Sequence, residues 1–138
     1  MKYPLIIFFT LLFSTGICQK SNLTVTINNI KTIKGNIQIG LYNNKELFPK
    51  VGQQFKVFYV KVTSTNLKYT IKGLDHGNYA LAIFHDENSD KKCNRNFLGI
   101  PYEDYGFSNN VRPFLSPPDF EDAMVNVNKN TIIEVKLD

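Results

Sequence analysis

The chain has few cysteines, which limits the redox chemistry available to it. It has two in 138 residues, and we expect Cys18 to be removed with an N-terminal segment, leaving Cys93 as the single thiol of the mature chain. An exported domain with one thiol has no internal disulfide, so its stability must come from its core. Cys93 is either a reactive thiol beside cations or a small apolar side chain packed under its loop, and burial is the commoner state.

The chain also lacks an apolar run of membrane-spanning length. The run from Leu5 to Phe13 is too short to cross a bilayer comfortably, and it follows Lys2 and precedes small residues. This pattern is typical of a secretory signal peptide. We predict a signal peptide over residues 1–18, one mature domain over residues 19–138 without a transmembrane segment, and a periplasmic or extracellular location. Lipid attachment to Cys18 is an alternative, although Ile17 departs from that signal.

Acidic residues are almost absent from the first half of the mature chain. Residues 19–74 hold nine lysines and one acid, Glu46, a net charge of +8, whereas residues 75–138 carry −5. The lysines mostly alternate with apolar residues, as the solvated face of a sheet does. This half lacks arginine, which does much of the specific reading of nucleic acids. We therefore predict that nucleic acid is not a partner.

Apolar residues recur at every second position along most of the chain, which is the period of half-buried strands. We predict an all-β fold, a seven-stranded antiparallel β-sandwich of transthyretin-like or immunoglobulin-like type. The predicted strands cover residues 23–27, 37–41, 55–62, 67–71, 79–85, 123–127 and 131–137. We expect the first two strands to form one hairpin and the last two another. The predicted core contains Leu23, Val25, Ile37, Ile39, Leu41, Leu81, Ile83, Val125 and Val135.

A long connection, residues 86–122, follows the fifth predicted strand. Loops of this length in small domains are usually functional or disordered, and an aromatic content this high favours order. We predict that it is ordered and that it carries the function. Phe107, Phe114 and Phe120 are expected to hold it against the sheets as a small satellite core.

Oxygen-bearing side chains recur at alternate positions where this connection begins. The candidate metal ligands are Asp86, Asn88, Asp90, the backbone carbonyl of Lys92, and Asn94. Their spacing is that of an EF-hand loop, so Ca²⁺ is the candidate cation. The glycine and the final glutamate of that motif are absent, and a carboxylate from Glu103, Asp104 or Glu121 would have to complete the shell. The alternative is that these side chains only shape turns.

Aromatic and amide side chains later in the connection suggest a binding surface. The candidate ligand-binding residues are Tyr102, Tyr105, Asn109, Asn110 and His85. Small β-domains hold sugars or peptides by stacking them on ring faces and bonding their edges to amides. We therefore expect a non-catalytic module that recognises a small-molecule, glycan or protein ligand, with Ca²⁺ as a candidate for ordering the loop. The alternative is a metal-dependent hydrolase that uses His85 and the loop carboxylates.

Four segments in chain order carry a resemblance to a known family. They are residues 73–88 (GLDHGNYALAIFHDEN), 96–101 (NFLGIP), 105–110 (YGFSNN) and 117–123 (PPDFEDA). The chain resembles a bacterial family catalogued as domain of unknown function 2141. The resemblance implies an exported protein, a transthyretin-like or immunoglobulin-like β-sandwich, and no established activity. The chain differs at residues 89–93, where the family usually has a glycine-rich stretch.

Overall fold

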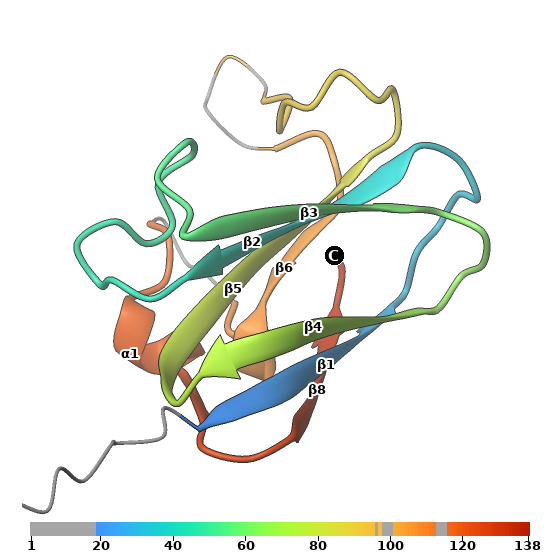
Figure 1. The fold of residues 1–138 in the computed structure, drawn as a ribbon. Helices are drawn as coiled ribbons and strands as arrows, with labels where there is room; N and C mark the ends of the chain where they lie inside the picture. The colour runs from blue at the N-terminus through green and yellow to red at the C-terminus, as the bar shows by residue number, and fades with distance from the viewer. Residues whose placement is uncertain (1–18, 96, 98–100, 113–115) are drawn as a thin grey trace, which may run out of the picture.

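Two β-sheets account for nearly all of the regular structure (Figure 1). The computed structural model describes residues 19–95, 97, 101–112 and 116–138. The eight strands are β1 (Lys20–Asn28), β2 (Asn36–Tyr42), β3 (Lys56–Lys61), β4 (Leu67–Asp75), β5 (Gly77–Asp86), β6 (Tyr105–Phe107), β7 (Val125–Val127) and β8 (Thr131–Lys136). A 3₁₀ turn, η1 (Ser108–Asn110), and one short helix, α1 (Phe120–Ala123), complete the order. Within these residues no helix is long and apolar enough to cross a bilayer.

The strand order differs from the predicted one in two respects. One sheet has the strand order β4-β1-β8. The other has the order β3-β2-β5-β6, and its fifth strand, β7, also pairs with β5. The all-β prediction is confirmed, but the described residues form eight strands rather than seven, and β1 and β8 are parallel. The three-stranded sheet is therefore mixed, whereas every strand pairing described in the other sheet is antiparallel.

Both predicted hairpins are wrong. β1 and β2 lie in different sheets, as do β7 and β8, because each connection crosses from one sheet to the other. Gly35 is not in a hairpin turn: it has a positive φ of 67°, and a Cβ on it would lie 2.1 Å from the carbonyl oxygen of Asp86. Glycine is required there because the backbone of the crossing connection passes against the end of β5.

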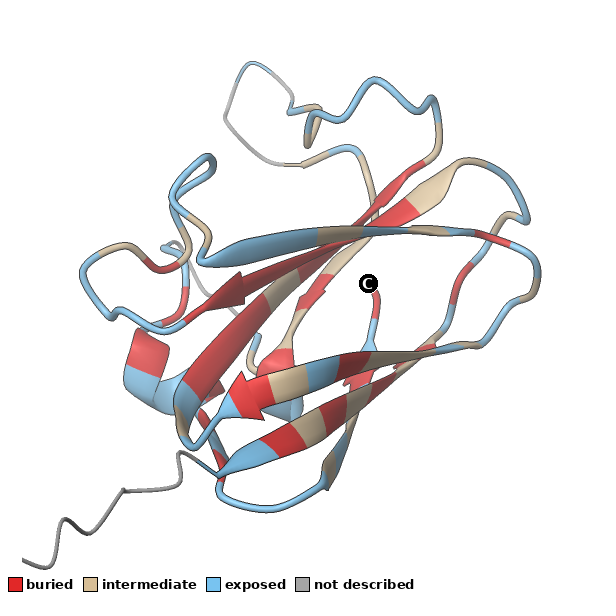
Figure 2. Cartoon of the chain, viewed as in Figure 1, coloured by how far each residue is buried: buried red, intermediate tan, exposed pale blue. Residues whose placement is uncertain are grey.

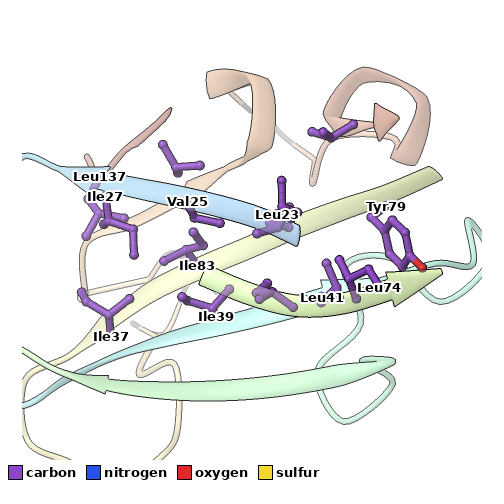
Figure 3. Close-up of a cluster of buried hydrophobic side chains, with 14 of the residues drawn as sticks. Leu23, Val25, Ile27, Ile37, Ile39, Leu41, Leu74, Tyr79, Ile83 and Leu137 are labelled. Atoms are coloured by element: carbon purple, nitrogen blue, oxygen red, sulfur yellow. The ribbon is translucent and has the colours of Figure 1, made fainter. Parts of the chain in front are cut away.

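The core lies between the two sheets, as predicted (Figure 3). All nine predicted core residues are buried, with no more than 6% of any of them exposed. The alternating burial along β1 and the nearly continuous burial along β2 and β5 show why (Figure 2): β1 has one buried face, whereas β2 and β5 are covered on both. The period-two pattern therefore identified the core correctly.

A second apolar cluster lies on the outer face of the five-stranded sheet. Tyr42, Phe48, Phe120 and Ala123 are buried there, with Phe107 packed against them. The Phe48 ring makes edge contacts with the rings of Tyr42, Phe107 and Phe120, at 5.2–6.0 Å between centroids. The prediction that Phe107 and Phe120 anchor the connection is confirmed. Phe114 lies outside the described residues, and Phe97 is 94% exposed.

The predicted long loop contains a strand that joins the two sheets. β6 pairs with Ala82–Phe84 of β5, while Tyr105 exchanges two backbone hydrogen bonds with Asp138, just beyond β8, at 3.2 and 3.0 Å. The backbones approach so closely that a Cβ on Gly106 would lie 2.7 Å from the carbonyl oxygen of Lys136. Residues 86–122 are therefore not one loop, because they supply part of a sheet edge.

We predict that Gly106→Ala lowers the free energy of unfolding by about 1–3 kcal/mol, the usual cost of overpacking a tight interior site. Urea denaturation followed by circular dichroism measures it. The matched control is Gly77→Ala, because a Cβ on Gly77 would meet only the Tyr79 ring, at the ordinary distance of 3.8 Å. Equal stability of the two variants would contradict the close crossing of β6 over β8.

Candidate functional site

The connection after β5 begins at a buried carboxylate. Asp86 ends β5 and is fully buried. Its Oδ1 accepts a hydrogen bond from the backbone N–H of Asp90 at 3.1 Å, and its Oδ2 accepts one from Lys91 at 2.8 Å. These bonds satisfy the buried charge and fold the chain into a turn, as aspartate commonly does.

The other candidate metal ligands belong to the same hydrogen-bond network. Asp90 Oδ2 accepts from the side-chain amides of Asn88 and Asn94, each at 3.1 Å, and its Oδ1 accepts from the Lys92 N–H at 2.8 Å. These bonds, first among them the Asn94 amide, lower the pKa of Asp90 below its ordinary value. The structure thus brings the side chains of Asp86, Asn88, Asp90 and Asn94 into one network. The oxygens of Asp86, Asn88 and Asp90 in it accept from N–H groups of the loop itself.

Of the three carboxylates considered for completing a metal shell, only Glu103 lies at this turn. Its Oε2 accepts the Asn94 N–H at 3.2 Å, and its pKa is raised, chiefly by burial and further by the negative charges of Asp86 and Asp90. Asp104 instead pairs with Lys31 at 2.6 Å. Across the described residues, no group of three or more His, Cys, Asp and Glu side chains is arranged to hold a metal ion, and Ca²⁺ binding stays a prediction.

His85 does not lie with the other ligand-binding candidates. It is fully buried, and Nε2 lies 2.8 Å from the backbone oxygen of Lys34. A carbonyl only accepts, so Nε2 carries the proton, and Nδ1 has no hydrogen-bond partner among the residues that the structure describes. The ring points to the same side of β5 as Ile83, toward the core between the sheets.

A hollow of about 510 Å³ lies where β6, η1 and β8 meet. It is lined by Tyr105, Gly106, Phe107, Asn110, Val111, Arg112, Glu134, Lys136 and Asp138. Two of the five predicted ligand-binding residues, Tyr105 and Asn110, are therefore brought together here. Tyr102 is 75% exposed and does not line the hollow, and the Asn109 amide donates to the backbone oxygens of Asp122 and Met124.

The hollow combines apolar rings with charged side chains. The rings of Tyr105 and Phe107 meet edge to face at 5.9 Å between centroids. Arg112 pairs with Asp138 at 2.8 Å, so those two charges offset each other. The Asn110 side chain bonds to the β8 backbone, donating to the Glu134 oxygen and accepting from the Lys136 N–H. Asn110 thus acts as part of the wall, and the rings and charged groups are what the hollow offers a ligand.

Sequence reasoning missed Arg112, Glu134 and Lys136. Glu134 and Lys136 alternate with the buried Val135, so the sequence showed that they point outward but not that they face the aromatic segment. A second depression, of about 630 Å³, lies at Asn43–Lys45, Asn78, Phe120, Glu121 and Met124. Apart from Glu121, it contains none of the residues predicted to form a site.

The thiol of Cys93 fits the packed interpretation better than the reactive one. The side chain is half-buried, and burial raises its pKa, with a smaller opposing effect from the Arg95 charge. Reactive cysteines have lowered pKa values, because the thiolate is the nucleophile.

We predict that Glu103→Gln stabilises the protein at neutral pH, by under about 1 kcal/mol because the group is only partly buried. The folded state raises the pKa of Glu103, so its ionised form opposes folding. The gain should shrink as pH falls through the carboxyl range and vanish once Glu103 is protonated in both folded and unfolded chains. Thermal melts between pH 3 and pH 7 measure it.

The control for this prediction is Asp104→Asn, which removes the neighbouring charge but also breaks the pair with Lys31. This variant should not gain stability at neutral pH. A Glu103→Gln protein that melts below the wild type at pH 7 would show that burial and the charges of Asp86 and Asp90 do not disfavour the ionised carboxylate.

Comparison with known proteins identifies the family. The model of a family described as an uncharacterized protein conserved in bacteria, DUF2141, matches residues 25–134, which is most of the chain. The match begins within β1, covers β2 to β7 and ends within β8, and it includes the predicted metal-binding turn and residues 105–112 beside the hollow. No curated protein and no solved structure matches the chain. The chain belongs to the bacterial DUF2141 family.

Proposed function

We propose that this protein is an exported, non-catalytic binding module that recognises a small-molecule, glycan or protein ligand through the segment between β5 and α1. The observation that carries the proposal is the hollow beside β6, where Tyr105 and Phe107 meet Arg112 and Lys136. Concave sites with apolar walls and a few charged groups are the usual form of ligand sites. Export is supported by the signal-like pattern of residues 1–18.

The competing function, a metal-dependent hydrolase, has less support. It requires His85 within hydrogen-bond reach of a carboxylate in a concave pocket. His85 lines neither depression, and its Nε2 proton is donated to the carbonyl of Lys34. We also infer that the two sheets form a sandwich of transthyretin-like or immunoglobulin-like type, which their short strands and single shared core support.

We predict that a ligand of this module contacts the hollow. In an NMR titration with a panel of disaccharides and short peptides, backbone shifts of the bound member should cluster at residues 105–112 and 134–138. Tyr105→Ala should weaken its binding at least about tenfold, as loss of a central aromatic contact does. Tyr102→Ala is the control, because it removes an exposed tyrosine outside the hollow. Shifts centred on residues 87–104 would move the site elsewhere.

We also propose that Ca²⁺ binds weakly at the turn that starts with Asp86. The negative charges of Asp86 and Asp90, which act on the Glu103 carboxyl and raise its pKa after burial does, support this, because a cation would offset their repulsion. The affinity should be no better than about 10⁻⁴–10⁻³ M, since the same oxygens already accept the loop's N–H groups.

Ten millimolar Ca²⁺ should then stabilise the fold by about 1.4–2.7 kcal/mol and raise the Tm relative to chelator. Asp90→Asn keeps an acceptor for the Lys92 N–H and removes the charge, so it should lose most of this rise. Identical wild-type melts with calcium and with chelator would leave these residues as turn formers only.

A further inference from the structure

The fold has two flanks, which are the sides where an edge strand of one sheet lies near an edge strand of the other. The two flanks differ in how far their backbone groups are hydrogen-bonded. On one flank the gap between the sheets is closed, because Tyr105 bonds to Asp138 and the Asn110 side chain bonds to the β8 backbone. On the opposite flank lie β3 and β4, one edge strand from each sheet, which follow each other along the chain (Figure 1). In the part of the chain that the structure describes, β3 pairs only with β2.

The open flank exposes both backbone and apolar side chains. An edge strand presents a row of unpaired N–H and C=O groups along its free side. Phe58 and Val60 of β3 pack against the core but stay partly exposed, as do Leu67 and Tyr69 of β4. The Phe58 and Tyr69 rings meet across the two sheets at 5.4 Å. The margin of the core is therefore incompletely covered here.

The outer side of β3 is also apolar, and its ends are basic. Val57 and Tyr59 point away from the core and are 37% and 48% exposed, which Figure 2 shows as an exposed strand beside the buried β2. Lys56 and Lys61 bound the strand, and no carboxylate of the described residues pairs with either. A strand added in antiparallel would thus meet cations at both ends and apolar groups between them.

We propose that the free edge of β3 binds an extended acidic peptide segment by strand addition. Alternate side chains of the added strand would cover Phe58 and Val60 on the inner side and contact Val57 and Tyr59 on the outer side. Acidic residues at its ends would lie opposite Lys61 and Lys56. A second copy is disfavoured as occupant, because antiparallel pairing of β3 with itself would place Lys56 opposite Lys61, and like charges in that position repel.

The test uses the peptide Glu-Val-Thr-Val-Thr-Glu, capped at both ends, which in antiparallel register places glutamates opposite Lys61 and Lys56 and valines opposite Val60 and Phe58. Titrated into ¹⁵N-labelled protein at low ionic strength, it should shift the amides of residues 56–61 and slow their hydrogen exchange. A matched peptide with proline in place of both threonines lacks two N–H groups and should not bind.

Two charge-reversed variants separate strand addition from general attraction. Lys56→Glu with Lys61→Glu should weaken binding of the glutamate peptide about two- to thirtyfold, the range for two cross-strand charge pairs, and favour a lysine-ended version. Lys68→Glu with Lys72→Glu makes the same change on β4 and should leave the affinity nearly unchanged. Equal loss in both variants, shifts mapping away from β3, binding of the proline peptide, no binding at all, or concentration-dependent dimerisation through β3 would each overturn the proposal.

Discussion

Pairing of the second edge of β5 is the constraint on which the rest of this structure depends. β2 covers one edge, and the other is covered in two pieces: β6 beside Ala82–Phe84 and β7 beside Gly77–Tyr79. Between them the N–H of Leu81 would be buried without a partner, which costs about 1–3 kcal/mol. The buried hydroxyl of Ser108 fills the gap, accepting from Leu81 at 2.9 Å and donating to the Ala123 carbonyl. The position of the segment between β5 and β7 is therefore set by the requirement that the backbone of β5 be hydrogen-bonded. The hollow is formed by residues that this pairing holds in place.

The turn that follows β5 is also shaped by the requirement that buried polar groups be hydrogen-bonded. Asp86 is buried, so its charge must be met by donors, and the donors within reach are the N–H groups of Asp90 and Lys91. Satisfying them fixes the path of the chain, and Gly35 allows the neighbouring connection to lie against it. Carboxylates of Glu87 and Asp104 are matched to Lys34 and Lys31 at the same end of the fold. Burial, and further the negative charges of Asp86 and Asp90, raise the pKa of Glu103, which is why its protonation should matter here.

The sequence predicted the strands and the core well, and the pairing poorly. Period-two alternation states which face of a strand is buried, and Leu23, Ile39 and Leu81 were found that way. It says nothing about which strand lies beside which, because β1 would present the same pattern next to β2 or next to β8. β6 was missed because three residues cannot establish a period, and its Tyr-Gly-Phe sequence resembles a binding loop as much as a strand.

The candidate site was predictable only in part, for a related reason. Residue type shows what a side chain can bond to, but not whether those bonds are already made within the fold. Asn109 and Asn110 both adopt positive φ, 59° and 53°, which asparagine tolerates better than most residues, and both amides bond to backbone groups of other segments.

Tyr105 lines the hollow because Phe84 opposite it fixes its register, whereas Tyr102 precedes the strand and stays in solvent. The two flanks differ in whether their backbone groups are already hydrogen-bonded. On the flank with the hollow, amide side chains and β6 already bond to the backbone, so a ligand could contact only rings and charged side chains. Where β3 ends the sheet, the backbone itself is still available, so any recognition there must begin with a partner that can pair as a strand.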